Sequence, residues 1–115
     1  MEIANVIETK FSTADADYPE IQQSDDVLTL SFTDWREREV TVVFEGVAAF
    51  KWQTIETLME GEEYDRCHEI ENSSWLSEHL KQHSVTKEEG HKHYKFNFNA
   101  CGQFEILATQ YNVKT

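Results

Sequence analysis

A pair of alternating strands between His91 and Tyr111 constrains the fold more than any other stretch of the chain. This stretch reads HKHYKFNFNACGQFEILATQY, with turn residues at Asn99 and Gly102. Side chains in a β-strand alternate between its two faces, so a period of two predicts a hairpin with one wide apolar face that another layer must cover. The apolar positions on that face are Tyr94, Phe96, Phe98, Phe104, Ile106 and Ala108.

Two segments nearer the N-terminus repeat this period. Val27–Thr33 and Val40–Glu45 each place three apolar residues on one face, with a charged turn between them. Glu45 and Gly46 are predicted to turn the chain into a further strand, Val47–Trp52, so that the three strands form an antiparallel meander. The inward residues of the first two strands are Leu28, Leu30, Phe32, Val40, Val42 and Phe44, and the apolar row of the third is Ala48, Phe50 and Trp52.

The other segments give weaker signals. Asn5–Ser12 is predicted as a strand at a sheet edge, and Tyr64–Glu71 as a strand whose buried face the pattern leaves open. Thr13–Asp26 is acidic and holds the single proline, so it is predicted as a surface loop. Gln53–Glu63 is predicted as a helical turn or an irregular loop, and Asn112–Thr115 as a tail.

One helix is predicted, from Ser74 to Gln82. The polar residues Asn72, Ser73 and Ser74 precede it, and short polar side chains cap helices by accepting hydrogen bonds from the first free amides. We therefore expect residues 1–115 to form a single α+β domain. It would have about five to seven strands in a mostly antiparallel sheet and one short helix packed on a face. The inward side of that helix is Trp75, Leu76, His79 and Leu80.

The charge balance restricts the partners. The 115 residues include 22 Asp and Glu against 10 Lys and Arg, a formal net charge of −12. Such a surface repels nucleic acid and anionic membranes and attracts basic proteins. No apolar run approaches the roughly 20 residues that span a bilayer, and the first ten residues lack the pattern of a secretory signal. We expect a cytoplasmic protein.

Four histidines form a candidate metal site for zinc, nickel or copper. His79 and His83 stand four apart on the predicted helix, and His91 and His93 stand two apart on a predicted strand, so each pair can share a face. Solvated or hydrogen-bonded histidines are the competing interpretation, because no HExxH motif accompanies them.

The cysteines and glycines give little support to catalysis. Cys67 and His68 are neighbours on a predicted strand and therefore point to opposite faces, while Cys101 lies in a turn, where only a cross-strand contact would bring it to His68. Two cysteines are too few for a disulfide scaffold, so we expect reduced thiols rather than a bridge. The four glycines are isolated and form no phosphate-binding motif. No catalytic residue and no cofactor are predicted.

Candidate protein-binding residues are exposed acids and one aromatic ring. Trp35 lies in a charged turn, and an exposed aromatic surrounded by charge is typical of an interface anchor, although the ring could also fold over the edge of the core. The acids would steer a basic partner toward the surface. They are Asp15, Asp17, Asp25, Asp26, Glu62 and Glu63.

Three segments carry a resemblance to known proteins. They read VVFEGVAAFKWQ (Val42–Gln53), EIENSSWLSEHL (Glu69–Leu80) and HYKFNFNACGQFEILATQY (His93–Tyr111). Together they resemble a set of small, acidic, uncharacterised bacterial proteins, which are similar to the small acidic immunity-type proteins of bacterial toxin systems. The shared motifs are a helix cap and turns. The resemblance therefore implies a bacterial protein-binding role and no catalytic residue.

Three hypotheses follow. The first is a non-enzymatic acidic module that binds another protein, such as a basic toxin, or a second copy of itself. The second is a small metal-binding protein or enzyme that uses the histidines or the Cys67–His68 pair. The third is a homodimer joined through a sheet edge or an apolar face, without a ligand.

Overall fold

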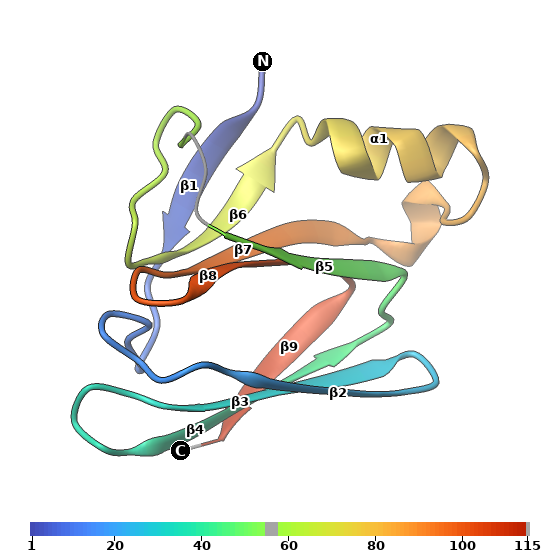
Figure 1. The fold of residues 1–115 in the computed structure, drawn as a ribbon. Helices are drawn as coiled ribbons and strands as arrows, with labels where there is room; N and C mark the ends of the chain where they lie inside the picture. Colours follow the sequence, from blue (N-terminus) through green and yellow to red (C-terminus); the bar gives the residue numbers. More distant parts are fainter. Residues whose placement is uncertain (55–57, 115) are drawn as a thin grey trace.

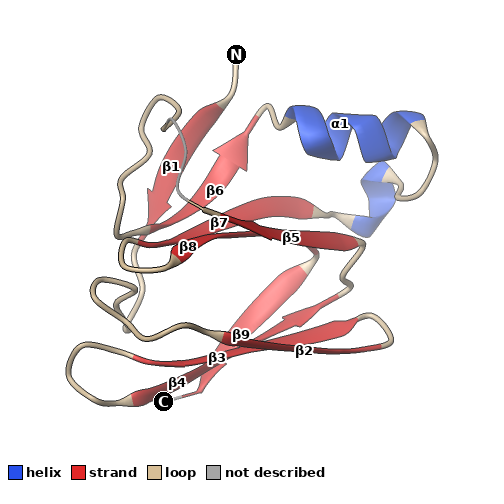
Figure 2. Ribbon diagram, in the orientation of Figure 1, coloured by secondary structure: helices blue, strands red, loops and turns tan. Residues whose placement is uncertain are grey.

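The chain folds into two stacked antiparallel sheets with one helix on the outer side of the larger sheet (Figures 1 and 2). The computed structural model describes residues 1–54 and 58–114. Sheet A has the strand order β1-β6-β7-β8-β5, and sheet B has the order β2-β3-β4-β9. The strands of sheet A are β1 (Ile3–Ile7), β6 (Cys67–Glu71), β7 (Lys92–Phe98), β8 (Gly102–Ala108) and β5 (Ala49–Gln53). Those of sheet B are β2 (Glu20–Ser24), β3 (Val27–Thr33), β4 (Glu39–Glu45) and β9 (Gln110–Lys114).

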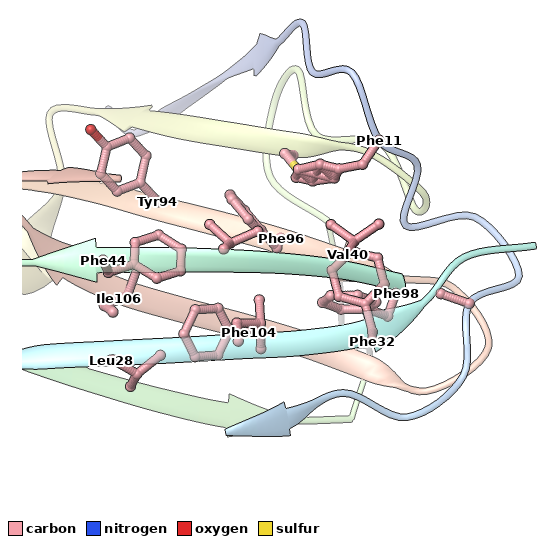
Figure 3. Close-up of a cluster of buried hydrophobic side chains, with 14 of the residues drawn as sticks. Phe11, Leu28, Phe32, Val40, Phe44, Tyr94, Phe96, Phe98, Phe104 and Ile106 are labelled. Carbon is pink, nitrogen blue, oxygen red and sulfur yellow. The ribbon is translucent and has the colours of Figure 1, made fainter. Parts of the chain in front are cut away.

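The core lies between the sheets and is largely aromatic (Figure 3). The ring of Phe44 on β4 lies 5.6 Å from Phe96 and 5.7 Å from Phe104, so side chains of the two sheets interlock. The twelve inward positions predicted on Val27–Thr33, on Val40–Glu45 and on the C-terminal hairpin are all buried in this cluster, and ten of them are at most 1% exposed. The apolar row predicted for Val47–Trp52 is not buried as a whole, because Ala48 and Phe50 are exposed and Trp52 is partly buried. The predicted C-terminal hairpin, the strand Val27–Thr33 and the α+β class are confirmed.

The helix α1 (Ser74–Lys81) begins where the cap signal predicts. Ser73 is its N-cap residue, and the Ser73 hydroxyl accepts a hydrogen bond of 3.0 Å from the amide of Leu76. No residue of α1 is fully buried, so it packs on the sheet with one partly covered side. A short 3-10 helix, η1 (Lys87–Glu89), follows and leads into β7.

The meander prediction is wrong after β4. At Gly46 the chain leaves sheet B, and β5 pairs with β8 in sheet A. Two backbone hydrogen bonds hold the chain where it passes from sheet B to sheet A. The amide of Ala48 donates to the carbonyl of Leu107 at 2.9 Å, and the amide of Thr109 donates to the carbonyl of Glu45 at 2.9 Å. The chain crosses back at Thr109, where β8 ends and β9 begins in sheet B.

Two segments predicted as irregular are strands. Thr13–Asp26 contains β2, which pairs with β3, and the described part of the predicted tail, residues 112–114, belongs to β9, which pairs with β4. Both strands are polar and lie at the edges of sheet B, where few apolar side chains are needed. The structure therefore has nine strands in two sheets within its described residues, more than the five to seven predicted.

Residues 58–66 lie against the outside of sheet A. Ile55, the first apolar residue of the predicted helical turn, lies outside the described residues. Further on, the amide of Ala4 on β1 donates to the carbonyl of Glu60 at 2.9 Å, and Gly61 adopts a φ of +83°. A Cβ atom at Gly61 would lie 2.2 Å from the carbonyl oxygen of Ala4, so only glycine permits this close approach. Residues 58–66 are thus fixed against β1.

No helix within residues 1–54 and 58–114 combines the length and the apolar character needed to cross a membrane.

Candidate functional site

The outer face of sheet A carries a buried polar layer. Each of its side chains belongs to a residue that is at most 8% exposed. Polar groups cost free energy when they are buried without partners, so such a layer requires a connected set of hydrogen bonds. The polar layer consists of Glu62 from the 58–66 segment and of His68, His93, Lys95, Asn97, Gln103 and Glu105 from β6, β7 and β8.

Glu62 is the centre of this layer. Its carboxylate accepts hydrogen bonds from Lys95 Nζ at 3.1 Å, from Asn97 Nδ2 at 2.7 Å and from Gln103 Nε2 at 3.1 Å. The amide of Met59 adds a fourth donor at 3.0 Å. The prediction that Glu62 is an exposed protein-binding acid is therefore wrong. Its carboxylate is fully covered and forms an ion pair with the buried Lys95 ammonium, 3.0 Å away.

A second chain of contacts joins the helix to the sheet. Ser73 Oγ lies 2.7 Å from His93 Nδ1, and His93 Nε2 lies 2.8 Å from Glu105 Oε1. Burial by itself would raise the pKa of Glu105. The hydrogen bond from His93 and the charges of Lys95 and Lys51 outweigh that effect and hold the pKa below its ordinary value.

This serine, histidine and glutamate have the connectivity of a nucleophile, base and orienting acid. Their surroundings suit a structural role. Ser73 is only 7% exposed, and its hydroxyl already holds the amide of Leu76 as the helix cap. The next free amide of the helix, that of Ser74, donates to the carboxylate of Glu2 at 3.0 Å. The donors that would stabilise an oxyanion are thus occupied, and the chain anchors α1 to β7 and β8.

Cys67 and His68 point to opposite faces, as predicted. Cys67 packs in the core between the sheets, where burial raises the pKa of its thiol and disfavours the nucleophilic thiolate. His68 lies in the polar layer, where its ring contacts the amide of Glu63 and the carbonyl of Lys95. Cys101 packs on the core side in the β7–β8 turn, so it does not face His68. Both cysteines are free.

The structure does not assemble the four-histidine site. His93 is committed to Ser73 and Glu105, His79 contacts the hydroxyl of Ser84, and His83 is exposed beyond the end of α1. Across residues 1–54 and 58–114, no group of three or more His, Cys, Asp or Glu side chains is arranged to hold a metal ion. The Trp75 ring packs beside two of the four imidazoles, with its centroid 5.1 Å from that of His93 and 6.0 Å from that of His79.

The remaining predicted binding residues lie on the surface but not together. Trp35 is 54% exposed in the β3–β4 turn, with the Arg36 guanidinium 4.8 Å from its ring centroid. Asp15 pairs with the Asn99 side chain of the β7–β8 turn. Asp25 and Asp26 lie in the β2–β3 turn, and Glu63 is exposed beside Arg66. These residues are too dispersed to form one site.

Asp17 is the predicted acid that the structure brings into a groove. The groove has a volume of about 440 Å³ and lies over the start of β2 and the adjoining parts of β3 and β4. The amide of Asp17 donates to the carbonyl of Thr33 at 3.1 Å, which fixes the loop beside the strands. We define the acidic groove by the side chains that line it on the outside of sheet B: Asp17, Tyr18, Glu20, Ser31, Thr33, Glu39 and Thr41.

The acidic groove has exposed charges above a floor of short hydroxyl side chains. Asp17, Glu20 and Glu39 are all exposed, and within the described part of the chain none of them forms an ion pair. Register places Ser31 between Glu20 and Thr41 on neighbouring strands, so these three side chains form one row across the sheet. Glu39 is not predictable as a binding residue from the sequence, because its place beside Glu20 depends on the pairing of β2, β3 and β4 in the sheet.

Tyr18 lines the acidic groove, and Trp35 lies in the turn that follows the groove residue Thr33. Tyr18 is 69% exposed, and its ring centroid lies 6.3 Å from that of Trp52 on β5. The turn that carries Trp35 begins directly after Thr33 at the end of the groove. This turn is rigid, because the buried Asp34 carboxylate accepts hydrogen bonds from the amides of Arg36 and Arg38 at 3.0 and 2.9 Å. Burial would raise the pKa of Asp34, but these hydrogen bonds and the Arg38 charge lower it.

Comparisons with known proteins add no relative. No protein-family model matches the chain, and no curated protein or solved structure matches it.

Proposed function

We propose that this protein is a non-enzymatic binding module that holds a basic segment of another protein in the acidic groove. The supporting observation is the set of three exposed carboxylates around a groove on the outside of sheet B. Among the described residues these carboxylates form no ion pair, and no described element covers that face. Lys and Arg side chains of a partner would supply the missing positive charge.

The floor of the groove favours an extended segment. Ser31, Thr33 and Thr41 have short side chains, so a backbone can approach the sheet and form hydrogen bonds with their hydroxyls. Tyr18, which lines this track and is 69% exposed, offers an aromatic ring to a cationic side chain. A second copy of the chain is a poor occupant, because its own groove and its net charge of −12 would repel the first.

A cytoplasmic location and an immunity-type role are part of this proposal. The buried free thiol of Cys67 suits a reducing compartment. Neutralisation of a basic toxin would use the same complementarity of charge, with the carboxylates speeding the encounter and the Tyr18 ring slowing dissociation.

Titration calorimetry with a synthetic peptide of alternating lysine and threonine tests the proposal. We expect this peptide to bind and its glutamate-threonine counterpart not to bind. Raising the ionic strength to the physiological range should weaken binding, because the Debye length shortens to about 8 Å. The triple variant Asp17→Asn, Glu20→Gln and Glu39→Gln should weaken it roughly tenfold, since each exposed pair contributes about 0.2–1 kcal/mol.

A control of equal charge separates a site from general attraction. The variant Asp25→Asn, Asp26→Asn and Glu88→Gln also removes three carboxylates, from the other end of the β2–β3 hairpin and from η1. It should retain most of the affinity at physiological ionic strength. Equal losses in the two triple variants, or no binding of the basic peptide by the unaltered protein, would overturn the proposal.

A further inference from the structure

Within the described chain, β2 is the least protected of the four edge strands. An edge strand exposes unpaired backbone groups, and proteins usually protect it with a lysine, a proline or a covering segment. In sheet A, the amide of Ala4 on β1 is bonded to Glu60, and β5 carries Lys51; in sheet B, β9 carries Lys114. β2 reads EIQQS, and among the described residues none forms a backbone hydrogen bond with its outer side.

The free backbone groups of β2 belong to Ile21 and Gln23. The turn between β2 and β3 has two residues, so Ser24 and Val27, which flank it, form the hydrogen-bonded pair that closes the hairpin. Hydrogen-bonded and non-hydrogen-bonded pairs alternate along an antiparallel ladder. The amides and carbonyls of Ile21 and Gln23 therefore point away from β3, toward the free edge.

An apolar seam lies beside this edge, between β2 and β5, the two edge strands in the foreground of Figure 1. We define the seam as Ile21 on β2 with Phe50 and Trp52 on β5. Each of the three is directly opposite a core residue of the neighbouring strand, so its side chain points toward the space between the sheets. Phe50 is 37% exposed, and Ile21 and Trp52 are partly buried. A strand added to β2 would cover this seam.

We propose that β2 receives an extended segment of another protein as a fifth strand of sheet B, and that apolar and basic residues alternate in this segment. Every second side chain of the segment would lie on the seam. The side chains between them would lie on the outside of sheet B, where the exposed carboxylates of Asp17 and Glu20 line the acidic groove. The basic character of the segment rests on the proposed function, whereas its pairing with β2 does not.

A second copy of the chain fits this edge less well. Antiparallel pairing of two β2 strands about Gln22 would place Glu20 of one copy opposite Ser24 of the other, next to Asp25 and Asp26 of that copy. Like charges at facing positions destabilise a sheet, and each copy has a net charge of −12.

Titration calorimetry with a six-residue peptide of alternating valine and lysine, acetylated and amidated at its ends, tests the pairing. We expect it to bind roughly tenfold more tightly than a lysine-threonine peptide of equal length, because valine buries more apolar surface on the seam.

Backbone N-methylation of this peptide supplies a matched pair of probes. One version is methylated at its three valines and the other at its three lysines. The amides of one set point to β2 and those of the other set point away, so one version should lose roughly tenfold or more in affinity and the other less than about threefold. Loss with methylated valine indicates an antiparallel segment, and loss with methylated lysine a parallel one.

Gln23→Pro tests β2 itself, because it removes an amide that points to the free edge. Proline is tolerated in an edge strand where its missing N–H would face solvent, so the variant should fold, which its melting temperature checks. It should bind the valine-lysine peptide roughly tenfold more weakly than the unaltered chain. Gln23→Ala keeps the amide and should change the affinity by less than about threefold. The methylated peptides decide the question if Gln23→Pro does not fold.

Three results would overturn the inference. The first is that the valine-lysine peptide does not bind, or that its two methylated versions bind equally well. The second is that folded Gln23→Pro binds this peptide as tightly as the unaltered chain. The third is a dimer of the unaltered chain in analytical ultracentrifugation that Gln23→Pro dissociates, since the edge would then belong to a second copy. If the methylated peptides differ as expected but the acidic-groove triple variant binds as the unaltered chain does, the proposed function fails and the pairing with β2 stands.

Discussion

Glu62→Gln should lower the stability of the fold more than the corresponding amide substitution of any other single Asp or Glu. The substitution removes the charge that neutralises Lys95, whose side chain is 6% exposed, and turns an acceptor for four donors into a group with donors of its own. Removing one partner of a buried ion pair costs about 3–5 kcal/mol. Domains of this size are stable by about 5–15 kcal/mol, so the melting temperature should fall on the order of 10–20 °C.

Urea denaturation followed by tryptophan fluorescence measures this loss. Glu63→Gln is the matched control, because Glu63 is the neighbouring residue and is half exposed with only a 4.0 Å contact to Arg66; it should change the free energy of unfolding by less than about 0.5 kcal/mol. The double variant Glu62→Gln with Lys95→Met removes both charges and should be more stable than the sum of the single losses by at least about 1 kcal/mol. A loss under about 1 kcal/mol for Glu62→Gln would refute the reasoning, since the polar layer would then be hydrated.

Three further changes probe the same fold. Burial holds the pKa of His68 below 6.5, so as the pH falls the unfolded chain takes up a proton before the folded chain does, and the free energy of unfolding should decrease below about pH 6.5. The lowered pKa of Glu105 adds a second loss of stability below about pH 4.5. A urea midpoint that stays constant from pH 7 to 5 would contradict the role of His68. Thermal denaturation should show that Gly61→Ala lowers the free energy of unfolding by at least about 2 kcal/mol, because the new Cβ would meet a backbone carbonyl. Gly90→Ala, also at positive φ but in open space, should lower it by about 1 kcal/mol. Asp34→Ala should lower the free energy of unfolding, measured in urea, by about 2–3 kcal/mol, because two amides of the turn and a guanidinium lose their acceptor. If Trp35→Ala lowered it more than Asp34→Ala does, the Asp34 hydrogen bonds would not be what makes the turn rigid.

Local patterns predict the parts of this fold that depend on local chemistry. The rows of β3, β4, β7 and β8 were predictable because one buried face imposes a period of two, and the start of α1 because Ser73 is a good cap. β2 and β9 were not, because edge strands bury few side chains and leave almost no apolar signal. The crossing of β5 to sheet A depends on distant partners, which neighbouring residues do not encode.

The burial of the polar layer is not predictable from the period of two. His93, Lys95 and Glu105 occupy outward positions on β7 and β8, and charged residues at alternate positions are typical of a face in water. The 58–66 segment and α1 cover that face instead. Leu107 does indicate this cover in the sequence. It lies on the outward row of β8, and a leucine in a row that would otherwise face water indicates that another element covers it; in the structure Leu107 is fully buried.

The pairing of β1 with β6, and of β4 with β9, joins segments that lie far apart in the sequence, residues 3–7 with 67–71 and 41–45 with 110–114. Neither sheet can therefore gain its full set of neighbours until distant parts of the chain have met, and closing such large loops costs entropy before the contacts return any free energy. We expect refolding in milliseconds to seconds rather than microseconds. During synthesis, the edge of β4 that pairs with β9 stays unpaired until β9 has left the ribosome. In that period the apolar face of β3 and β4 is exposed and can aggregate.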